Sequence, residues 1–191
     1  MGIVTKSNLV VRDATLLREI GQHNQVFVNL TITTVNTDLA RILEPRAPRP
    51  DLRLEAVRQL NLAGVSAGII CAPVLPGITD APRDLEALVV AAAQAGAKSI
   101  HANPLFLKPC SASIFLPFLE KEFPHLAASY RERFEQRAFL PPAYGKRLSQ
   151  LMARLRVKHG IRNAYERYAW RVQPSASVEG EQLGLFATDP A

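Results

Sequence analysis

Polar side chains follow each of the four segments that we expect to be strands, and their chemical types suit ligand binding. They combine hydroxyl groups, both signs of charge, an amide and an imidazole. In parallel α/β folds, ligands bind at the carboxyl ends of the strands. The residues concerned are Thr5, Lys6, Ser7, Thr31, Thr33, Thr34, Pro73, Pro76, Gly77, Asp80, His101, Asn103 and Lys108. This set fits a small-molecule site rather than a recognised catalytic constellation.

Several common catalytic and cofactor motifs are missing from the sequence. No glycine-rich phosphate loop follows any expected strand, and there is no nucleophile elbow. Gly77 meets the backbone needs of a turn or allows the close approach of a ligand. The four histidines are isolated in sequence, and only His101 is expected to face the site. A surface or satisfied histidine is the alternative to a functional role for it.

Composition limits the class of protein. Cys71 and Cys110 are thirty-nine residues apart, a spacing that forms neither a metal site nor a disulfide framework. We expect buried or half-buried thiols in a reducing compartment. The sequence has no apolar stretch long enough to span a membrane and no signal-peptide layout at its start. These features predict a cytoplasmic protein with no membrane partner.

The elements that must position the polar residues alternate between strand and helix. Strands are expected at 3–6, 26–34, 65–73 and 99–107, and helices from Asp13, at 38–43, at 52–63 and at 83–95. Gly21, Gly64 and Gly96 are the expected helix stops. This alternation predicts right-handed βαβ units and a parallel sheet.

After Pro109 the sequence changes to successive helices, expected at 114–123, 125–139 and 143–159. The last has an apolar stripe formed by Leu148, Leu151, Met152 and Leu155. Between Arg131 and Arg171, eleven Lys/Arg face three Asp/Glu, so a local balance of +8 exceeds the net +6 of the chain. The segment predicts a nucleic-acid surface that includes Arg147, Arg154 and Lys158, with aromatic residues able to stack on bases. A solvated helical face is the alternative.

The end of the chain contains an apolar island after a Pro/Ser/Gly-rich stretch at 173–180. Its residues Gln182, Leu183, Gly184, Leu185 and Phe186 resemble the pentapeptide by which bacterial polymerases and repair proteins bind the sliding clamp. Adjacent large apolar side chains after a flexible linker suit a pocket on a partner. The alternative is that the tail covers the apolar surface of its own chain.

A resemblance to a known family rests on an ordered set of short runs. These are 5–7, 11–13, Glu44-Pro45-Arg46-Ala47-Pro48, Arg53-Leu54, 60–64 and Ala72-Pro73-Val74-Leu75-Pro76-Gly77-Ile78-Thr79-Asp80. Together they resemble the second half of radical SAM proteins of the group related to spore photolyase, also described as DNA-repair-photolyase-like. The resemblance covers roughly residues 3 to 124.

The resemblance implies an α/β fold, a partial parallel (β/α) barrel carrying units three to six of a six-unit barrel. It implies a barrel segment at 1–124, a basic helical extension at 125–172 and a tail at 173–191. S-adenosylmethionine in that family lies across the strand ends, which here implies contacts from Thr31, Thr33, Arg53, Pro76 and Gly77. Arg53 would hold a carboxylate in a two-pronged contact; a solvent-exposed first-turn arginine is the alternative.

The sequence departs from the family in its cysteines. Radical SAM enzymes hold a 4Fe–4S cluster with three thiolates in a Cys-x3-Cys-x2-Cys loop, and the two cysteines here cannot form it. We therefore expect neither cofactor on this chain alone, whether it comes from a truncated reading frame or completes a barrel with an N-terminal half supplied in trans. The alternative function is a non-catalytic DNA-associated adaptor that binds the sliding clamp.

Overall fold

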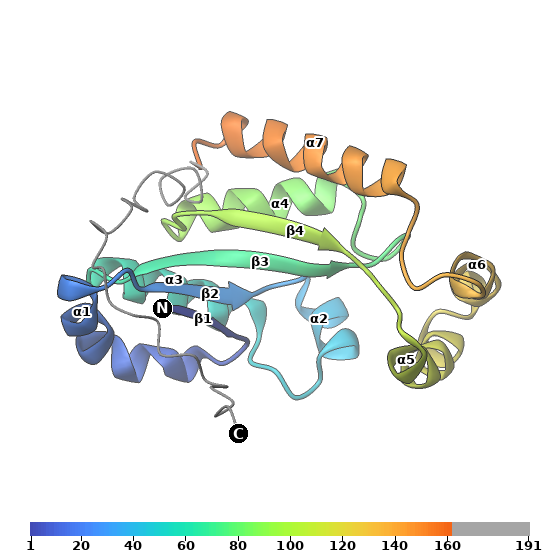
Figure 1. The fold of residues 1–191 in the computed structure, drawn as a ribbon, viewed down its shortest axis with the longest axis horizontal. Helices are drawn as coiled ribbons and strands as arrows, with labels where there is room; N and C mark the ends of the chain where they lie inside the picture. Colours follow the sequence, from blue (N-terminus) through green and yellow to red (C-terminus); the bar gives the residue numbers. More distant parts are fainter. Residues whose placement is uncertain (162–191) are drawn as a thin grey trace, which may run out of the picture.

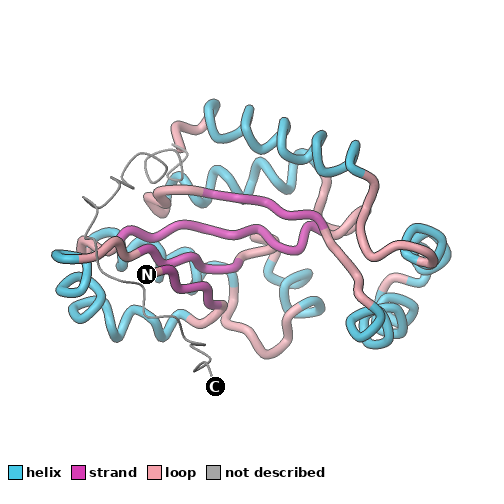
Figure 2. Tube along the Cα trace, in the orientation of Figure 1, coloured by secondary structure: helices cyan, strands magenta, loops and turns pink. Residues whose placement is uncertain are grey.

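The computed structural model describes residues 1–161, and four parallel strands form its sheet. The strands are β1 (Gly2–Thr5), β2 (Phe27–Thr31), β3 (Ser66–Val74) and β4 (Ile100–Pro104). They lie side by side in chain order, β1-β2-β3-β4, with Val4 opposite Asn29 and Asn29 opposite Gly68 (Figures 1 and 2). The predicted α/β class with a parallel sheet is confirmed.

Eight helical segments complete the described part of the chain. They are η1 (Asn8–Asp13), α1 (Ala14–His23), α2 (Thr37–Leu43), α3 (Pro50–Leu62), α4 (Pro82–Gln94), α5 (Pro109–Glu122), α6 (Pro124–Phe134) and α7 (Pro142–Lys158). Each of the last five has proline in its first turn, where the missing N–H lacks a helical partner anyway. Gly64 and Gly96 adopt positive φ just after α3 and α4, as expected of helix stops.

The main core joins one face of the sheet to a layer of helices. Val28, Leu30, Ala67, Ile69 and Ile100 are fully buried in one cluster with apolar residues of α1, α3, α4 and α7. Because side chains alternate along a strand, the intervening residues of β2 point to the other face. Those residues include asparagine and threonine, so the polar groups predicted to bind a ligand lie away from the helix layer.

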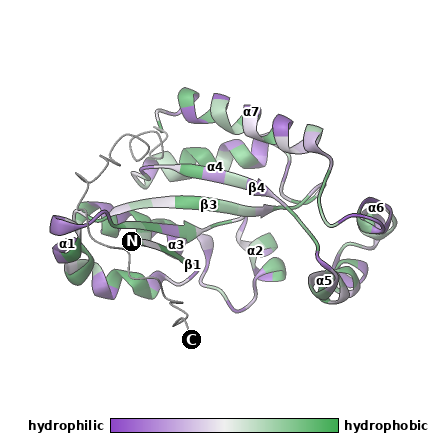
Figure 3. Ribbon diagram, viewed as in Figure 1, coloured by the Kyte–Doolittle hydropathy of each residue, from purple (hydrophilic) through white to green (hydrophobic). Residues whose placement is uncertain are grey.

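Helix α7 packs against β4 and α4 (Figure 1). Leu148, Met152 and Leu155 of its predicted apolar stripe are buried in the main core. Its turns alternate between apolar and polar residues along the ribbon (Figure 3), as expected of an amphipathic helix with one solvated face. Helices α5 and α6 lie beyond the carboxyl ends of β3 and β4, with a second, smaller core around Leu119 and Tyr130 (Figure 1).

Several predicted boundaries are wrong. Gly21 does not stop α1, which continues to His23, because a glycine without a positive φ can remain in a helix. Helix α5 begins at Pro109 rather than at 114, since proline suits a first turn. Helix α6 ends at Phe134 rather than 139, and Phe139 instead pairs with Phe106 in an isolated antiparallel bridge. Among residues 1–161, no helix is long and apolar enough to cross a membrane.

Candidate ligand site at the carboxyl ends of the strands

A cluster of three charged side chains lies where β1 and β2 end, and we call Lys6, Glu44 and Arg53 the charge cluster. The Arg53 Nη1 atom is 2.7 Å from a carboxylate oxygen of Glu44 and donates a second hydrogen bond of 2.7 Å to the Thr31 carbonyl oxygen. The Lys6 Nζ atom is 3.0 Å from the other carboxylate oxygen of Glu44. The Glu44 carboxylate, which follows α2, therefore links Lys6 after β1 to Arg53 of α3.

The charge cluster is graded from buried to exposed. The Arg53 side chain is 1% exposed, that of Glu44 9% and that of Lys6 49%. The alternative of a solvent-exposed Arg53 is therefore wrong. Removing one partner of a buried ion pair costs about 3–5 kcal/mol, because the remaining charge is left unpaired. Arg53 thus fixes the Glu44 carboxylate against the end of β2, and Lys6 is the member of the cluster that solvent reaches.

Buried polar atoms without a partner accompany the charge cluster. Within residues 1–161, the Asn29 Oδ1, Thr33 Oγ1, Ser99 Oγ and Arg53 Nε atoms are buried and form no hydrogen bond. Such a group costs about 1–3 kcal/mol when left unsatisfied, so most native structures pair it with protein, water or a ligand. Thr33 lies two residues beyond Thr31, the last residue of β2. The Thr33 and Arg53 atoms therefore offer unused hydrogen-bonding capacity near the carboxyl ends of the strands, whereas Asn29 lies within β2 and Ser99 just before β4.

A glycine separates two of these unsatisfied groups on the sheet. Gly68 pairs with Asn29 on one side, and Ile69 N–H donates to Ser99 O on the other. A Cβ atom on Gly68 would lie 2.5 Å from Ser99 Oγ and 2.8 Å from Ser99 O. The close approach of Ser99 therefore requires glycine at this position.

The turn after β3 is held from several directions. Gly77 has φ of 76°, and its N–H donates to Asp80 Oδ1 at 2.7 Å. The Leu75 N–H donates to Thr79 Oγ1 at 2.8 Å. From outside, the Tyr130 hydroxyl donates to the Pro76 carbonyl oxygen at 2.8 Å. The predicted Pro76–Gly77 turn is thus a rigid feature of the carboxyl end of the sheet.

Two phenols and an imidazole near the strands have shifted pKa values. Burial raises the pKa of Tyr130, and burial together with the bond to Asp80 Oδ2 at 2.9 Å raises the pKa of Tyr144. Both phenols therefore remain protonated donors at neutral pH. Burial, helped by the Arg156 guanidinium, lowers the pKa of half-buried His101, which favours its neutral form.

The two cysteines lie in different surroundings. Cys71 is fully buried in the main core, its Sγ atom is 3.7 Å from the Thr33 carbonyl oxygen, and burial raises its pKa to about 12. Cys110 is exposed, so the expectation of buried or half-buried thiols is wrong for it. In the described part of the chain, no three His, Cys, Asp or Glu residues are grouped to hold a metal ion.

The structure brings together some predicted site residues and reveals others. Thr31 touches the charge cluster through its carbonyl oxygen, Arg53 belongs to it, and Thr33 lies in the segment after β2. Sequence reasoning missed Glu44 as a site residue, although Glu44-Pro45 was part of the family resemblance. It also missed Tyr130 of α6, which belongs to no motif or periodic pattern in the sequence.

The residues predicted to contact nucleic acid lie together on α7. Arg147, Arg154 and Lys158 are exposed, and their spacing of seven and four residues places them on one side of the helix. Lys158 is bonded to Glu86 of α4 at 2.7 Å, and His159 Nε2 is 3.0 Å from the same oxygen. Within residues 1–161, Arg147 and Arg154 form no ion pair. The predicted clamp-binding residues Gln182, Leu183, Leu185 and Phe186 lie outside the described residues.

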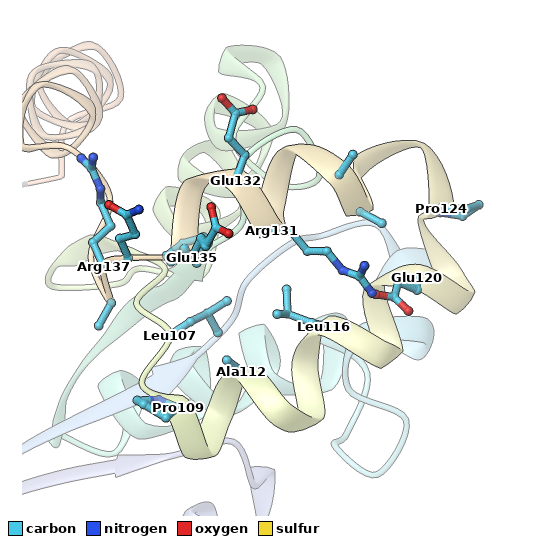
Figure 4. A pocket seen from close by; sticks show the side chains of 15 residues that line it. Leu107, Pro109, Ala112, Leu116, Glu120, Pro124, Arg131, Glu132, Glu135 and Arg137 are labelled. Carbon is cyan, nitrogen blue, oxygen red and sulfur yellow. The ribbon is translucent and has the colours of Figure 1, made fainter.

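A separate groove of about 1370 Å³ lies between α5, α6 and the segment after α6. Leu107, Ala112 and Leu116 form its apolar floor, and an Arg131–Glu120 ion pair bridges the two helices (Figure 4). None of its lining residues belongs to the charge cluster. The groove is therefore distinct from the candidate site at the strand ends.

Comparison with known proteins finds relatives without an assigned function. An uncharacterized protein of Mycobacterium tuberculosis is 31% identical over 161 residues, which are 84% of this chain and 47% of that protein. Uncharacterized proteins of Acidianus two-tailed virus and Methanocaldococcus jannaschii are 36% identical over 106 residues and 30% identical over 80, covering 35% and 30% of their own lengths. The chain spans about half the length, or less, of the curated relatives it matches. No family model and no solved structure matches it.

Proposed function

We propose that this chain is part of a radical SAM-type barrel and that its strand ends bind S-adenosylmethionine. The observation that carries the proposal is the charge cluster. An α-amino acid head group has one positive and one negative charge, and both need a partner. Glu44, held by Arg53, suits the ammonium group, and half-exposed Lys6 suits the carboxylate. Arg53 then acts through Glu44 rather than by direct contact.

Two further observations support a barrel segment. Helices α1, α3, α4 and α7 contribute to one core on one face of the sheet, whereas a doubly wound sheet carries helices on both faces. The strands follow one another in chain order, as they do around a barrel. The relatives of about twice the length leave room for the other units of such a barrel.

The residues present fit one family cofactor and not the other. Unsatisfied Thr33 Oγ1 and Arg53 Nε fit a polar ligand such as S-adenosylmethionine, whose role in that family is to supply the 5′-deoxyadenosyl radical that removes hydrogen from a substrate. Buried Cys71 and exposed Cys110 do not fit a 4Fe–4S cluster. We therefore assign this chain binding of the methionyl group and no step that involves iron.

Isothermal titration of the purified full chain with S-adenosylmethionine tests the proposal. We expect saturable binding that Thr33→Val weakens, because its hydroxyl is removed without a change of shape. Lys6→Met should weaken binding of methionine alone but not of adenosine alone. A matched control is Lys98→Met, which removes an exposed lysine outside the charge cluster. Lack of saturable binding, or equal loss in the control, contradicts the proposal.

The exposed cations of α7 favour a second candidate function, a nucleic-acid-associated adaptor. Arg147 and Arg154 have no ion-pair partner within residues 1–161, so their charge is available to phosphates. Their replacement by Glu should abolish salt-dependent binding of duplex DNA. Arg83→Glu on α4 is the control, because it reverses an exposed arginine away from α7, one that pairs with Asp84. If Arg83→Glu weakens DNA binding as much as the replacement of Arg147 and Arg154 does, α7 is not the binding surface. Clamp binding by the tail remains a separate proposal.

A further inference from the structure

Two phenylalanine rings are stacked on the surface next to the candidate site. The centroids of Phe106 and Phe139 are 5.8 Å apart, with an angle of 25° between the ring planes. Their exposed fractions are 52% and 62%. Exposed aromatic rings contribute little to a buried core, so packing does not explain why this pair lies on the surface.

A short antiparallel ribbon holds the two rings in place, and we call residues 106–108 and 137–139 the aromatic ribbon. Phe106 and Phe139 form an antiparallel bridge, and Leu107 N–H donates to Ala138 O at 2.8 Å. Leu107 is 4% exposed and lines the groove between α5 and α6, as Ala138 does. The ribbon therefore has one face toward the protein and one face toward solvent.

The aromatic ribbon also carries two cations. Lys108 follows Phe106 by two residues, and Arg137 precedes Phe139 by two residues. Both cations are exposed, and Arg137 also lines the groove between α5 and α6. Arg137 extends away from the groove floor formed by Leu107 and Ala112 (Figure 4). Each phenylalanine of the pair thus has an exposed cation two residues away in the sequence.

We propose that the aromatic ribbon binds single-stranded nucleic acid, with an unstacked base against the phenylalanine pair and adjacent phosphates on Lys108 and Arg137. Flat apolar rings beside cations match a ligand that combines flat rings with regularly spaced negative charge. An apolar peptide would use the rings and leave the two cations without a role. The inference does not depend on S-adenosylmethionine binding.

The place of the ribbon suits a substrate-binding role. Phe106 follows the end of β4 at Pro104, and Phe139 precedes α7, which begins at Pro142. The ribbon thus joins the connection from β4 to α5 with the connection from α6 to α7, at the same end of the sheet as the charge cluster (Figure 1). A strand held there would extend along the rim on which Lys6, Glu44 and the Pro76–Gly77 turn also lie.

Fluorescence anisotropy of the full chain with a labelled oligonucleotide of about twelve thymidines at low salt tests the inference, because single-strand sites span about 4–16 nucleotides. Phe106→Leu with Phe139→Leu keeps the apolar bulk and removes the rings. We expect binding to weaken roughly tenfold, which is about 1.4 kcal/mol. Replacement of both by Trp should preserve binding, and Ile114→Ala, which removes another exposed apolar side chain, on α5, should leave it unchanged.

Two ligand controls separate base stacking from charge. An abasic oligonucleotide of the same length should bind the wild type as weakly as the thymidine oligonucleotide binds the leucine variant. Lys108→Glu with Arg137→Glu should weaken both ligands and reduce the salt dependence. Ribonucleotide and deoxyribonucleotide versions report which sugar is preferred. The inference is overturned if the abasic and thymidine ligands bind equally or if the leucine variant with an unchanged urea midpoint binds as tightly as the wild type.

Discussion

Two buried threonines allow a direct test of whether the strand ends are built for a ligand. Thr33 and Thr79 are 5% and 2% exposed, and valine replaces either with almost no change of shape. Thr79 Oγ1 accepts from Leu75 N–H at 2.8 Å, whereas Thr33 Oγ1 has no partner within residues 1–161. Thr79→Val leaves a buried N–H unsatisfied and should destabilise the protein by about 1–3 kcal/mol. Thr33→Val removes a group that is already unsatisfied, so it should leave stability unchanged or raise it.

Urea denaturation at constant m-value measures both changes, and a thermal scan gives the same order. A protein of this size shifts its Tm by about 2–4 °C per kcal/mol. We expect a loss of about 2–12 °C for Thr79→Val, and no loss for Thr33→Val. If Thr33→Val destabilises the ligand-free protein as much as Thr79→Val does, its hydroxyl is already used within the fold. The argument that this hydroxyl is held for a ligand then fails.

Three further predictions concern the sheet, the cysteines and the helix layer. Gly68→Ala should destabilise by about 1–3 kcal/mol through overpacking, whereas Gly21→Ala, with no atom within 4 Å of the new Cβ, should stabilise α1 by about 0.5–1 kcal/mol in urea denaturation. In the native protein a thiol reagent should modify Cys110 quickly and Cys71 only on unfolding, because its thiol is buried and its pKa is raised to about 12; equal rates contradict this. Hydrogen bonds from Lys158 and His159 lower the pKa of Glu86. The wild type should therefore be more stable than Glu86→Gln above the ordinary pKa of 4.5, and this difference should disappear as the pH falls through the lowered pKa. A difference that persists at the lowest pH contradicts that assignment.

The order of strands and helices could be predicted from the sequence because the chain marks its elements locally. Alternating segments, prolines before helices and Gly64 and Gly96 after them are signals that no distant residue changes. The errors arose where tertiary contacts decide. The segment after Phe134 has a composition that continues a helix, and it becomes extended where it pairs with the chain after β4.

The sequence could predict the place of the candidate site, at the ends of the strands, but not the contacts within it. Thr31, Thr33 and Arg53 were chosen because they follow strands or match a family motif, and neither argument shows which partner each side chain takes. The pairing of Arg53 with Glu44 joins residues from α3 and the loop after α2, and the sequence has no periodic signal for it. The stacking of Phe106 on Phe139 could not be predicted for the same reason, because thirty-three residues and two helices separate them.

The α5–α6 pair and α7 help to shape the strand-end site, although they follow the last strand in the chain. Tyr130 of α6 donates to Pro76 O, and Tyr144 of α7 donates to Asp80 Oδ2, while the other Asp80 oxygen accepts from Gly77 N–H. Both phenols are protonated over the physiological pH range, as phenols with an ordinary pKa are, and burial raises their pKa further. The turn after β3 is therefore fixed by one phenol from each helix in addition to its own Asp80. Any ligand that contacts Pro76 or Gly77 binds to a surface whose position depends on the helices that also flank the aromatic ribbon.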